Sequence, residues 1–346
     1  MHMADALLSP AVGGSLWAAS AGLLAYSSSR LKASLDDRRV PLMGVLAAFV
    51  FAAQMINFSI PGTGSSGHLG GGLILAVLLG PHAAFLSIAS VLAVQALFFA
   101  DGGLLALGCN IFNLGFFPCF LAYPLIYKPL AGEAPDRGRL MAASVIAATI
   151  GLQLGAFGVV LETVASSISE LPFSSFVLLM QPIHLAIGLV EGAVTAMLLA
   201  FLHKARPELF GAAQPGPQAR SLRPVLVGLA LAAMVFGGVF SWFAASAPDG
   251  LEWSMAKVSG KEQLEAPEHG IHATLDALQK RVAFLPDYNF KEPEAATSDG
   301  VAARQADSWP NVSAGTSLSG LLGGFMTLCL AGVVALVLRR RAPAKS

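Results

Sequence analysis

The chain has 346 residues, of which 55% are hydrophobic and only 12% are charged, and its mean hydropathy is +0.67. This composition excludes an ordinary water-soluble domain, because several windows hold the roughly 20 apolar residues that cross a bilayer core. Basic and acidic side chains both number 21, and this balance indicates nothing by itself, because what matters is the side of the membrane on which the charges fall. No nucleic-acid partner is expected for such a membrane protein.

The chain begins with Met1-His2, ahead of an apolar helix predicted over residues 10–29. The terminal amine, the backbone nitrogen of His2 and its imidazole can bind one metal ion in two small chelate rings, which leaves one position open in a four-nitrogen plane. Sites of this kind suit Ni(II), Cu(II) and, less well, Co(II). The alternative is a chance histidine in a frayed terminus. Because His2 is bulky and no cleavable signal peptide is apparent, we expect Met1 to be the true terminus.

Eight further apolar spans are predicted along the chain. They cover residues 41–59, 70–80, 82–100, 104–127, 139–163, 173–202, 224–245 and 317–338. Lys and Arg gather in the connections at 30–39, 128–139 and 203–223 and in the tail from 339. Nine spans place all four basic segments on one side, which the positive-inside rule assigns to the cytoplasm. The N-terminus, the loop that holds His68 and residues 246–316 then lie outside.

His68 follows the run Gly64-Ser65-Ser66-Gly67 and precedes three further glycines after Leu69. Such a segment cannot be regular helix throughout, and its glycines allow close backbone approach to a ligand. Non-helical backbone at membrane depth is tolerated where it lines a cavity or is buried in protein. Two interpretations remain open, a loop that approaches a bound ion and a flexible outer loop with an incidental histidine.

Several polar residues fall within or at the ends of the predicted spans. Asp101 and Asn110 suit helix capping and hydrogen bonding between helices, or the support of a pocket. His184 and Glu191 share one helix face, where they either orient a metal-binding histidine or form an internal ion pair. Glu162 has no obvious partner in the sequence.

Three isolated cysteines, Cys109, Cys119 and Cys329, are expected to be small buried residues rather than a disulfide framework or thiolate site. The chain has no HExxH, GxSxG or P-loop motif, so it is not expected to hydrolyse ATP. A transporter built in this way would take its energy from another subunit.

The sequence resembles the CbiM/NikM family, the metal-binding S components of nickel and cobalt energy-coupling factor transporters, over about residues 1–204. The segments that carry the resemblance are Met1-His2-Met3, Gly64 to His68 with Gly80-Pro81, Asp101-Gly102-Gly103 through Leu107-Gly108-Cys109-Asn110, and His184 to Gly192. The remainder resembles the PDGLE module, similar to the accessory component CbiN/NikN and here fused. Its loop opens with the literal sequence Pro248-Asp249-Gly250-Leu251-Glu252.

The resemblance implies an all-α transmembrane bundle of about seven spans, plus two C-terminal spans around an extracytoplasmic loop domain. The implied organisation is a metal-binding domain at 1–204, a cytoplasmic linker at 205–223, a PDGLE module at 224–338 with its loop at 246–316, and a basic cytoplasmic tail at 339–346. The implied metal ligands are the Met1 amine, the His2 backbone nitrogen and imidazole, and the His68 imidazole. Supporting residues are expected at Ser66, Asp101, Asn110, His184 and Glu191. One departure from the family is visible, because Asp5 is followed by Ala6 where glycine is usual.

The implied function is capture of Ni²⁺ or Co²⁺ for an ATP-driven importer, with no prosthetic group and no enzymatic activity in this chain. Imported cobalt would supply cobalamin biosynthesis, and imported nickel would supply nickel enzymes. The expected partners are a CbiQ/NikQ-like transmembrane coupling subunit, CbiO/NikO-like ATPase subunits and the lipid of the inner or plasma membrane. The N-terminus would lie outside and the C-terminus in the cytoplasm.

Two rival functions stay open, an intramembrane enzyme of cobalamin metabolism that uses His184 and Glu191, and a metal channel or sensor that needs no ATP. The sequence does not choose between nickel and cobalt, since the same four nitrogens bind both.

Overall fold

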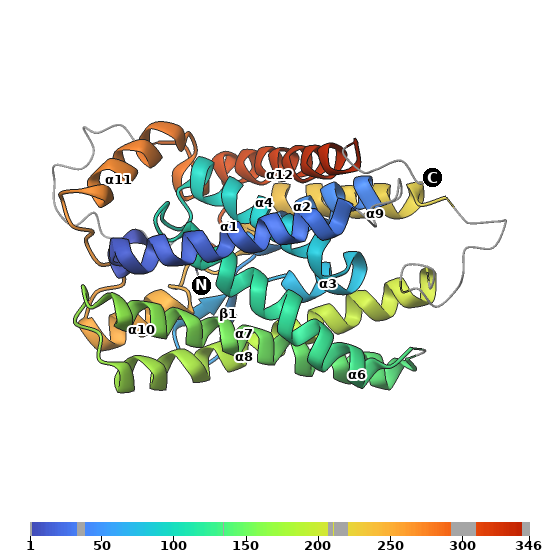
Figure 1. Cartoon of the computed structure of the whole chain (residues 1–346), viewed down its shortest axis with the longest axis horizontal. Helices are drawn as coiled ribbons and strands as arrows, with labels where there is room; N and C mark the ends of the chain where they lie inside the picture. Colours follow the sequence, from blue (N-terminus) through green and yellow to red (C-terminus); the bar gives the residue numbers. More distant parts are fainter. Residues whose placement is uncertain are drawn as a thin grey trace.

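The protein is described from a computed structural model, which defines residues 2–32, 39–133, 135–206, 210, 221–291 and 309–340. Long helices run along the longest axis of the molecule (Figure 1). The predicted helical bundle is confirmed, with one addition. Strands β1 (Phe58–Ile60) and β2 (Ser65–Gly67) form an antiparallel hairpin in which Ser59 pairs with Ser66.

The N-terminal part contains a short 3₁₀ turn, the hairpin and a series of helices. These are η1 (Asp5–Leu7), α1 (Pro10–Lys32), α2 (Arg39–Gln54), α3 (Gly72–Leu79), α4 (Pro81–Phe99), α5 (Leu107–Ile111), the π-helical η2 (Phe112–Tyr127), α6 (Lys128–Ala131), α7 (Arg137–Ser166) and α8 (Phe173–Ala205). The C-terminal region, residues 221–291 and 309–340, contains α9 (Arg223–Gly238), η4 (Phe240–Phe243), α10 (Gly250–Ser259), α11 (Ile271–Val282), η5 (Pro286–Tyr288) and α12 (Ala314–Arg340).

Five helices of the described part are long and apolar enough to cross a membrane, namely α4, the continuous helix Leu107–Ala131, α7, α8 and α12. Helices α2 and α9 are apolar but shorter. The predicted span at 41–59 is wrong at its end, because the helix stops at Gln54 and the chain turns into the hairpin. The predicted 70–80 segment is the eight-residue α3, which follows a left-handed turn at Gly71 (φ 75°).

The C-terminal region packs directly on the rest of the bundle. Gly237 of α9 and Gly320 of α12 bring these two helices into backbone contact, since an added Cβ at either glycine would meet the other helix. Gly44 of α2 lies against α12 in the same way, with an added Cβ 3.0 Å from the Leu328 carbonyl oxygen. Small residues at close helix crossings are the usual means of packing in a membrane.

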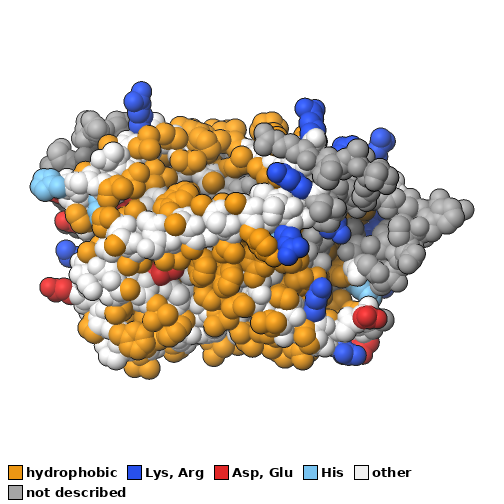
Figure 2. Space-filling model, viewed as in Figure 1, with side chains coloured by type: hydrophobic (Ala, Val, Ile, Leu, Met, Phe, Trp, Pro, Cys, Tyr) orange, Lys and Arg blue, Asp and Glu red, His pale blue; other side chains and the backbone are white. Residues whose placement is uncertain are grey.

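The two ends of the bundle differ in character. One end of the bundle holds the end of α1, the start of α2, the α6–α7 connection, the end of α8, the start of α9 and the end of α12 (Figure 1). Most Lys and Arg side chains visible in Figure 2 gather toward that end, and apolar side chains cover the middle. Helices α10 and α11 lie at the opposite end, where the predicted metal-binding segments also meet.

Candidate metal centre

The N-terminal segment is held inside the bundle by Asn110. The Asn110 Oδ1 atom accepts a hydrogen bond from the Met3 backbone N–H (2.8 Å), and its Nδ2 group donates to the Met3 carbonyl oxygen (3.2 Å). The N–H of Gly103 donates to the same carbonyl oxygen (2.9 Å). Met3 and Asn110 are both buried. Asn110 therefore serves the N-terminal segment, rather than only a neighbouring helix, and this anchoring brings His2 into the interior.

Asp5 fixes the following turn. Its Oδ1 atom accepts a hydrogen bond from the Ala106 N–H (2.9 Å), which joins Asp5 to the segment between α4 and α5. Burial raises the pKa of Asp5, and hydrogen bonds from the backbone N–H groups of that segment partly offset the rise. Ala6 is buried within the 3₁₀ turn Asp5–Leu7.

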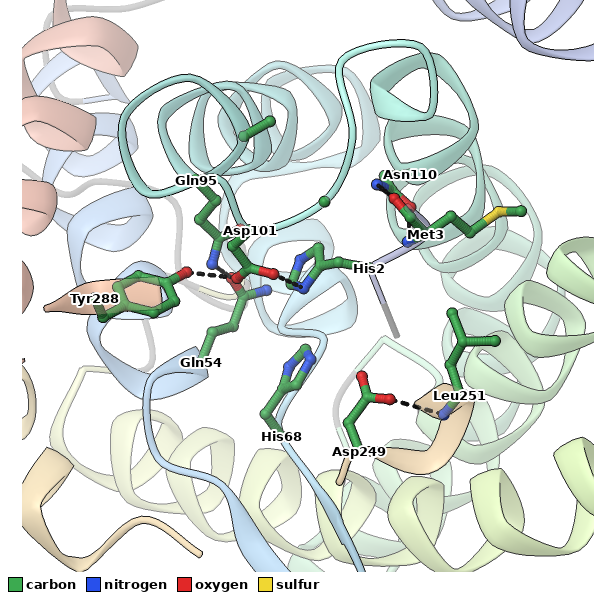
Figure 3. A network of polar contacts seen from close by, with 12 residues as sticks. His2, Met3, Gln54, His68, Gln95, Asp101, Asn110, Asp249, Leu251 and Tyr288 are labelled. Carbon is green, nitrogen blue, oxygen red and sulfur yellow. Dashed lines mark hydrogen bonds and ion pairs between the residues drawn. The ribbon is translucent and has the colours of Figure 1, made fainter. Parts of the chain in front are cut away.

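The side chains of His2 and His68 meet at this end of the bundle (Figure 3). Their rings stack with centroids 5.1 Å apart and an interplanar angle of 6°. The His68 Nδ1 atom lies 3.1 Å from the Leu69 carbonyl oxygen, which favours the tautomer with its proton on Nδ1 and its lone pair on Nε2. Burial, followed by nearby positive charge that includes His2, lowers the pKa of His68 to about 3. His68 is therefore neutral at physiological pH, as a metal ligand must be.

Asp101 is the carboxylate beside His2. Its Oδ1 atom lies 3.1 Å from Nδ1 of His2, and its Oδ2 atom accepts a hydrogen bond from the Tyr288 hydroxyl. Burial alone would raise the pKa of Asp101, but His2 and Tyr288 together hold it below its ordinary value. Of the two roles considered for Asp101, helix capping does not hold, because Asp101 follows α4 and its side chain is directed to His2. The Nε2 atom of His2 is buried without a hydrogen-bond partner in the described part.

Glu191 supports the segment that follows His68. Its two carboxylate oxygens accept hydrogen bonds from the backbone N–H groups of Gly70 (3.1 Å) and Gly71 (3.0 Å). The Gly70 carbonyl oxygen accepts a further bond from the Gln54 side chain (2.8 Å). The Glu191 carboxylate of α8 and the Gln54 amide of α2 thus fix the backbone of Gly70 and Gly71.

His184 does not pair with Glu191, so the predicted alternative of an internal ion pair is wrong. The His184 Nδ1 atom lies 2.8 Å from the Met180 carbonyl oxygen of its own helix, while Nε2 is buried without a partner among the described residues. His184 lies in a small hollow that His68, Asp249 and Gly250 also line. It therefore lies on the His68 side of the histidine pair.

Ser66 joins the His68 loop to the C-terminal region. Its backbone N–H donates to the Pro248 carbonyl oxygen (2.8 Å), and its hydroxyl donates to the Ala247 carbonyl oxygen (2.7 Å). Trp253 donates its ring N–H to the Thr63 carbonyl oxygen (2.9 Å). The start of α10 is therefore hydrogen-bonded to the His68 hairpin.

Asp249 combines a capping role with a position at the histidine pair. Its Oδ1 atom accepts hydrogen bonds from the N–H groups of Leu251 and Glu252. The Glu252 side chain in turn accepts a hydrogen bond from the Asp249 N–H through Oε2. Asp249 was not predicted as a site residue, although its spacing to Glu252 is the sequence signal of a capping box. Asp249 lines a cavity of about 830 Å³ together with His2, His68 and Asp101, so the C-terminal region forms one wall of the candidate site.

Other sequence predictions have clear outcomes. Glu162 has a partner, since its Oε2 atom accepts a hydrogen bond from the Asn113 side chain (2.8 Å). Cys109 and Cys119 are buried as predicted, whereas Cys329 is exposed on α12. The prediction for Cys329 is wrong because α12 lies at the periphery, where a small apolar side chain can face lipid without cost.

The described residues contain no group of three or more His, Cys, Asp or Glu side chains arranged to hold a metal ion. Met1 lies outside the described residues, so its predicted amine ligand remains a prediction.

Two protein-family models match the chain. The model described as cobalt uptake substrate-specific transmembrane region matches residues 2–209, and the PDGLE domain model matches residues 223–340. A putative metal transport protein of Haloquadratum walsbyi is 36% identical over 209 residues, which cover 60% of this chain and 93% of that protein.

Fused relatives and solved structures match as well. The putative fused nickel transport protein NikMN of Archaeoglobus fulgidus is 35% identical, with 66% of this chain and 75% of that protein covered. The cobalt transport protein CbiM of Geobacter sulfurreducens is 31% identical, over 67% of this chain and 68% of that protein. A crystal structure of a truncated transition metal transporter aligns with a TM-score of 0.53 at 29% identity, over 59% of this chain and 99% of that chain.

Proposed function

The chain belongs to the CbiM family of cobalt uptake transmembrane regions, with a fused PDGLE domain, and from this premise we propose that it captures Ni²⁺ or Co²⁺ for an energy-coupling factor importer. One observation carries the proposal. The stacked rings of His2 and His68 line a cavity at the end of the bundle opposite the basic connections, and Met3, next to His2, is buried. Imidazole nitrogens are suitable ligands for both metals.

The proposed site has four nitrogen ligands, namely the Met1 amine, the His2 backbone nitrogen, the His2 imidazole and the His68 imidazole. Within His2, only Nδ1 closes a six-membered ring with the backbone nitrogen. Since Nδ1 lies beside Asp101 in the described structure, the imidazole has to turn about its Cβ–Cγ bond for the chelate to form. The turn exchanges the two edges of the ring and brings Nε2 to the edge that faces Asp101. Asp101 then accepts the remaining ring N–H, as carboxylates next to metal-binding histidines commonly do.

Metal capture at this site should release protons. The amine and the His2 amide nitrogen must each lose a proton before they bind the ion, whereas His68 is already neutral. Acid should therefore weaken capture mainly through the N-terminal nitrogens. Four residues would hold the ligands in place: Asp101 beside His2, Asn110 at Met3, Glu191 behind the His68 loop and Ser66 at the C-terminal region. His184 would support the site from the side of His68.

The transport role needs partners. We assign the basic end of the bundle to the cytoplasm by the positive-inside rule, so the cavity opens outside. The chain has no P-loop, and a CbiQ/NikQ-like coupling subunit with CbiO/NikO-like ATPases would supply the energy. Nickel is favoured over cobalt by a planar four-nitrogen ligand set, and fused relatives are named as nickel transport proteins. The rival enzyme is disfavoured, because both carboxylate oxygens of Glu191 accept hydrogen bonds from backbone N–H groups.

The experiment is metal uptake in cells that lack their own nickel importer. Cells that express this chain with the coupling and ATPase subunits should accumulate radioactive Ni²⁺, and His2→Ala should abolish the accumulation. The chain expressed alone, or with an ATPase variant that cannot hydrolyse ATP, should bind metal without accumulation. Accumulation by the chain alone would favour the channel instead.

A further inference from the structure

Tyr288 links the C-terminal region to the histidine pair through one carboxylate. Its hydroxyl donates to Oδ2 of Asp101, and Oδ1 of the same carboxylate lies 3.1 Å from His2 Nδ1 (Figure 3). Burial raises the pKa of Tyr288 well above 10, and the charge of Asp101 adds to the rise, so the hydroxyl keeps its proton and remains a donor. The hydroxyl, the carboxylate and the imidazole form a chain that runs from the C-terminal region to His2.

The position of the hydroxyl is set by the packing of the ring. Tyr288 stacks on Phe99 of α4, with ring centroids 5.0 Å apart and planes 16° apart. Phe51 of α2 contacts the Tyr288 ring edge-on at 6.3 Å. Aromatic contacts of this kind hold a ring whether or not its hydroxyl is bonded. Removing the hydroxyl alone should therefore leave the ring in place.

The backbone at this point is strained. Asp287 and Tyr288 have φ values of 50° and 58°, in the left-handed region that residues other than glycine rarely adopt. Two successive residues in this conformation persist only where the surroundings fix them, and such strain concentrates at functional positions. The strain is thus a second feature of Tyr288, independent of its hydrogen bond.

The segment that leads to Tyr288 is bonded to both flanks of the Asp101 turn. The Gln279 side chain donates to the Ala96 carbonyl oxygen (2.9 Å) before the turn and to the Gly102 carbonyl oxygen (2.7 Å) after it. The Leu285 N–H donates to the Phe98 carbonyl oxygen (3.3 Å). The residues from α11 to η5 are therefore hydrogen-bonded to the turn that contains Asp101.

We propose that Tyr288 is a positioning residue of the metal site, whose hydroxyl fixes the Asp101 carboxylate and through it the His2 imidazole. The inference rests on the proposed function, because it assigns His2 to the metal. A carboxylate that is hydrogen-bonded on both oxygens loses its freedom to rotate, and its partner imidazole is held in one plane. The C-terminal region then determines how tightly and for how long the ion is held.

The experiment uses the full-length chain in detergent, with Ni²⁺ as the probe, and compares Tyr288→Phe with the unaltered protein. We measure affinity by competition titration, the rate of metal loss to excess chelator, and the visible absorption band of bound Ni²⁺. Outer-shell partners of metal ligands typically affect affinity by about 10–100-fold, so we expect about tenfold weaker binding, faster metal loss and a shifted band. The metal-free protein should still fold, with a melting temperature lowered by no more than the loss of one hydrogen bond. Tyr26→Phe removes a hydroxyl bonded to Arg30 at the opposite end of α1 and should alter none of these values.

A double-mutant cycle with Asp101→Asn separates positioning from packing. If Tyr288 acts through Asp101, Tyr288→Phe should add no further loss of affinity in the Asp101→Asn background. Unchanged affinity and spectrum in Tyr288→Phe, or an equal loss in both backgrounds, would overturn the inference and leave the proposed function intact. Failure of the unaltered protein to bind Ni²⁺, or full binding by His2→Ala, would overturn both.

Discussion

The imidazole rings of His2 and His68 are stacked, with centroids 5.1 Å apart and planes within 6° of parallel, although they come from two separately anchored segments. Asn110 fixes the segment of His2 through Met3, and Glu191 fixes the segment after His68 through two glycine N–H groups. Each histidine is therefore held by bonds that do not involve the other. Because both segments are in place before an ion binds, only the His2 ring has to turn, and this lowers the ordering cost of binding.

The His68 imidazole should be indispensable for tight binding. We expect His68→Ala to weaken Ni²⁺ binding by more than about 100-fold, because the loss of a ligand should exceed the roughly 10–100-fold loss caused by an outer-shell partner. His184→Ala should be milder, at or below about tenfold on the same scale, since His184 is proposed to support the site and is not a proposed ligand. His203→Ala, at the far end of α8, should have no effect. Competition titration of the three proteins tests this order, and a His184→Ala loss as large as that of His68→Ala would contradict it.

The Glu191 carboxylate should stabilise the His68 loop. In Glu191→Gln the amide oxygen can accept one of the two N–H groups, but the amide NH₂ faces the other. We expect a loss of about 1–3 kcal/mol in the free energy of unfolding, together with weaker metal binding. Thermal unfolding of the metal-free protein measures the first effect, with the exposed Glu170→Gln as the control for lost charge. A Glu191→Gln protein as stable as that control would show that the two hydrogen bonds contribute nothing.

The contact between α10 and α8 should not tolerate a methyl group at Gly250. An added Cβ there would lie 2.9 Å from Cε1 of His184 and 3.1 Å from Cδ1 of Ile187. We expect Gly250→Ala to cost about 1–3 kcal/mol by overpacking and to accelerate proteolysis of the C-terminal region. Gly228→Ala in α9 is the matched control, because an added Cβ there meets nothing within 4 Å. Equal melting temperatures and equal proteolysis of the two variants would count against this docking.

The metal-free protein should lose stability in mild acid because of His68. Its folded pKa of about 3 lies below the ordinary value of 6.5, so between these pH values the unfolded chain binds a proton that the folded chain does not. The contribution of His68 is therefore constant above about pH 6.5 and falls as the pH is lowered toward 3. Melting temperatures at pH 7.5, 6.0 and 5.0 should fall less steeply in His68→Asn than in the unaltered protein. Identical slopes would mean that His68 titrates normally.

The histidine pair could be predicted from the sequence because both partners have local signals. His2 is at the second position of the chain, and His68 follows a glycine-rich run between apolar spans. The alternation of basic connections then places both at the same end of a helical bundle. The short apolar helix at 70–80 was predicted and is α3, whereas the hairpin was not predicted, since a glycine-rich segment indicates a break in helix without specifying what replaces it.

The contribution of the C-terminal region could not be predicted in this way. Tyr288 lies in a polar stretch with no helical or strand period, and its position at Asp101 depends on packing against Phe99 and Phe51. Glu191 was predicted as a supporting residue, but its partners are backbone N–H groups, which carry no residue-specific signal. Contacts between distant segments follow from tertiary packing and not from local pattern.

The central proposal is that the terminal amine of Met1 and the His2 backbone nitrogen bind the ion, and one added residue tests it most directly. A single alanine is placed before Met1, and the new initiator methionine that precedes this alanine is removed. The extended protein keeps every side chain of the original chain, but its terminal amine lies outside the chelate. We expect tight Ni²⁺ binding to be abolished in this protein, while the melting temperature of the metal-free form changes little. Ni²⁺ affinity equal to that of the unextended chain would contradict the chelate.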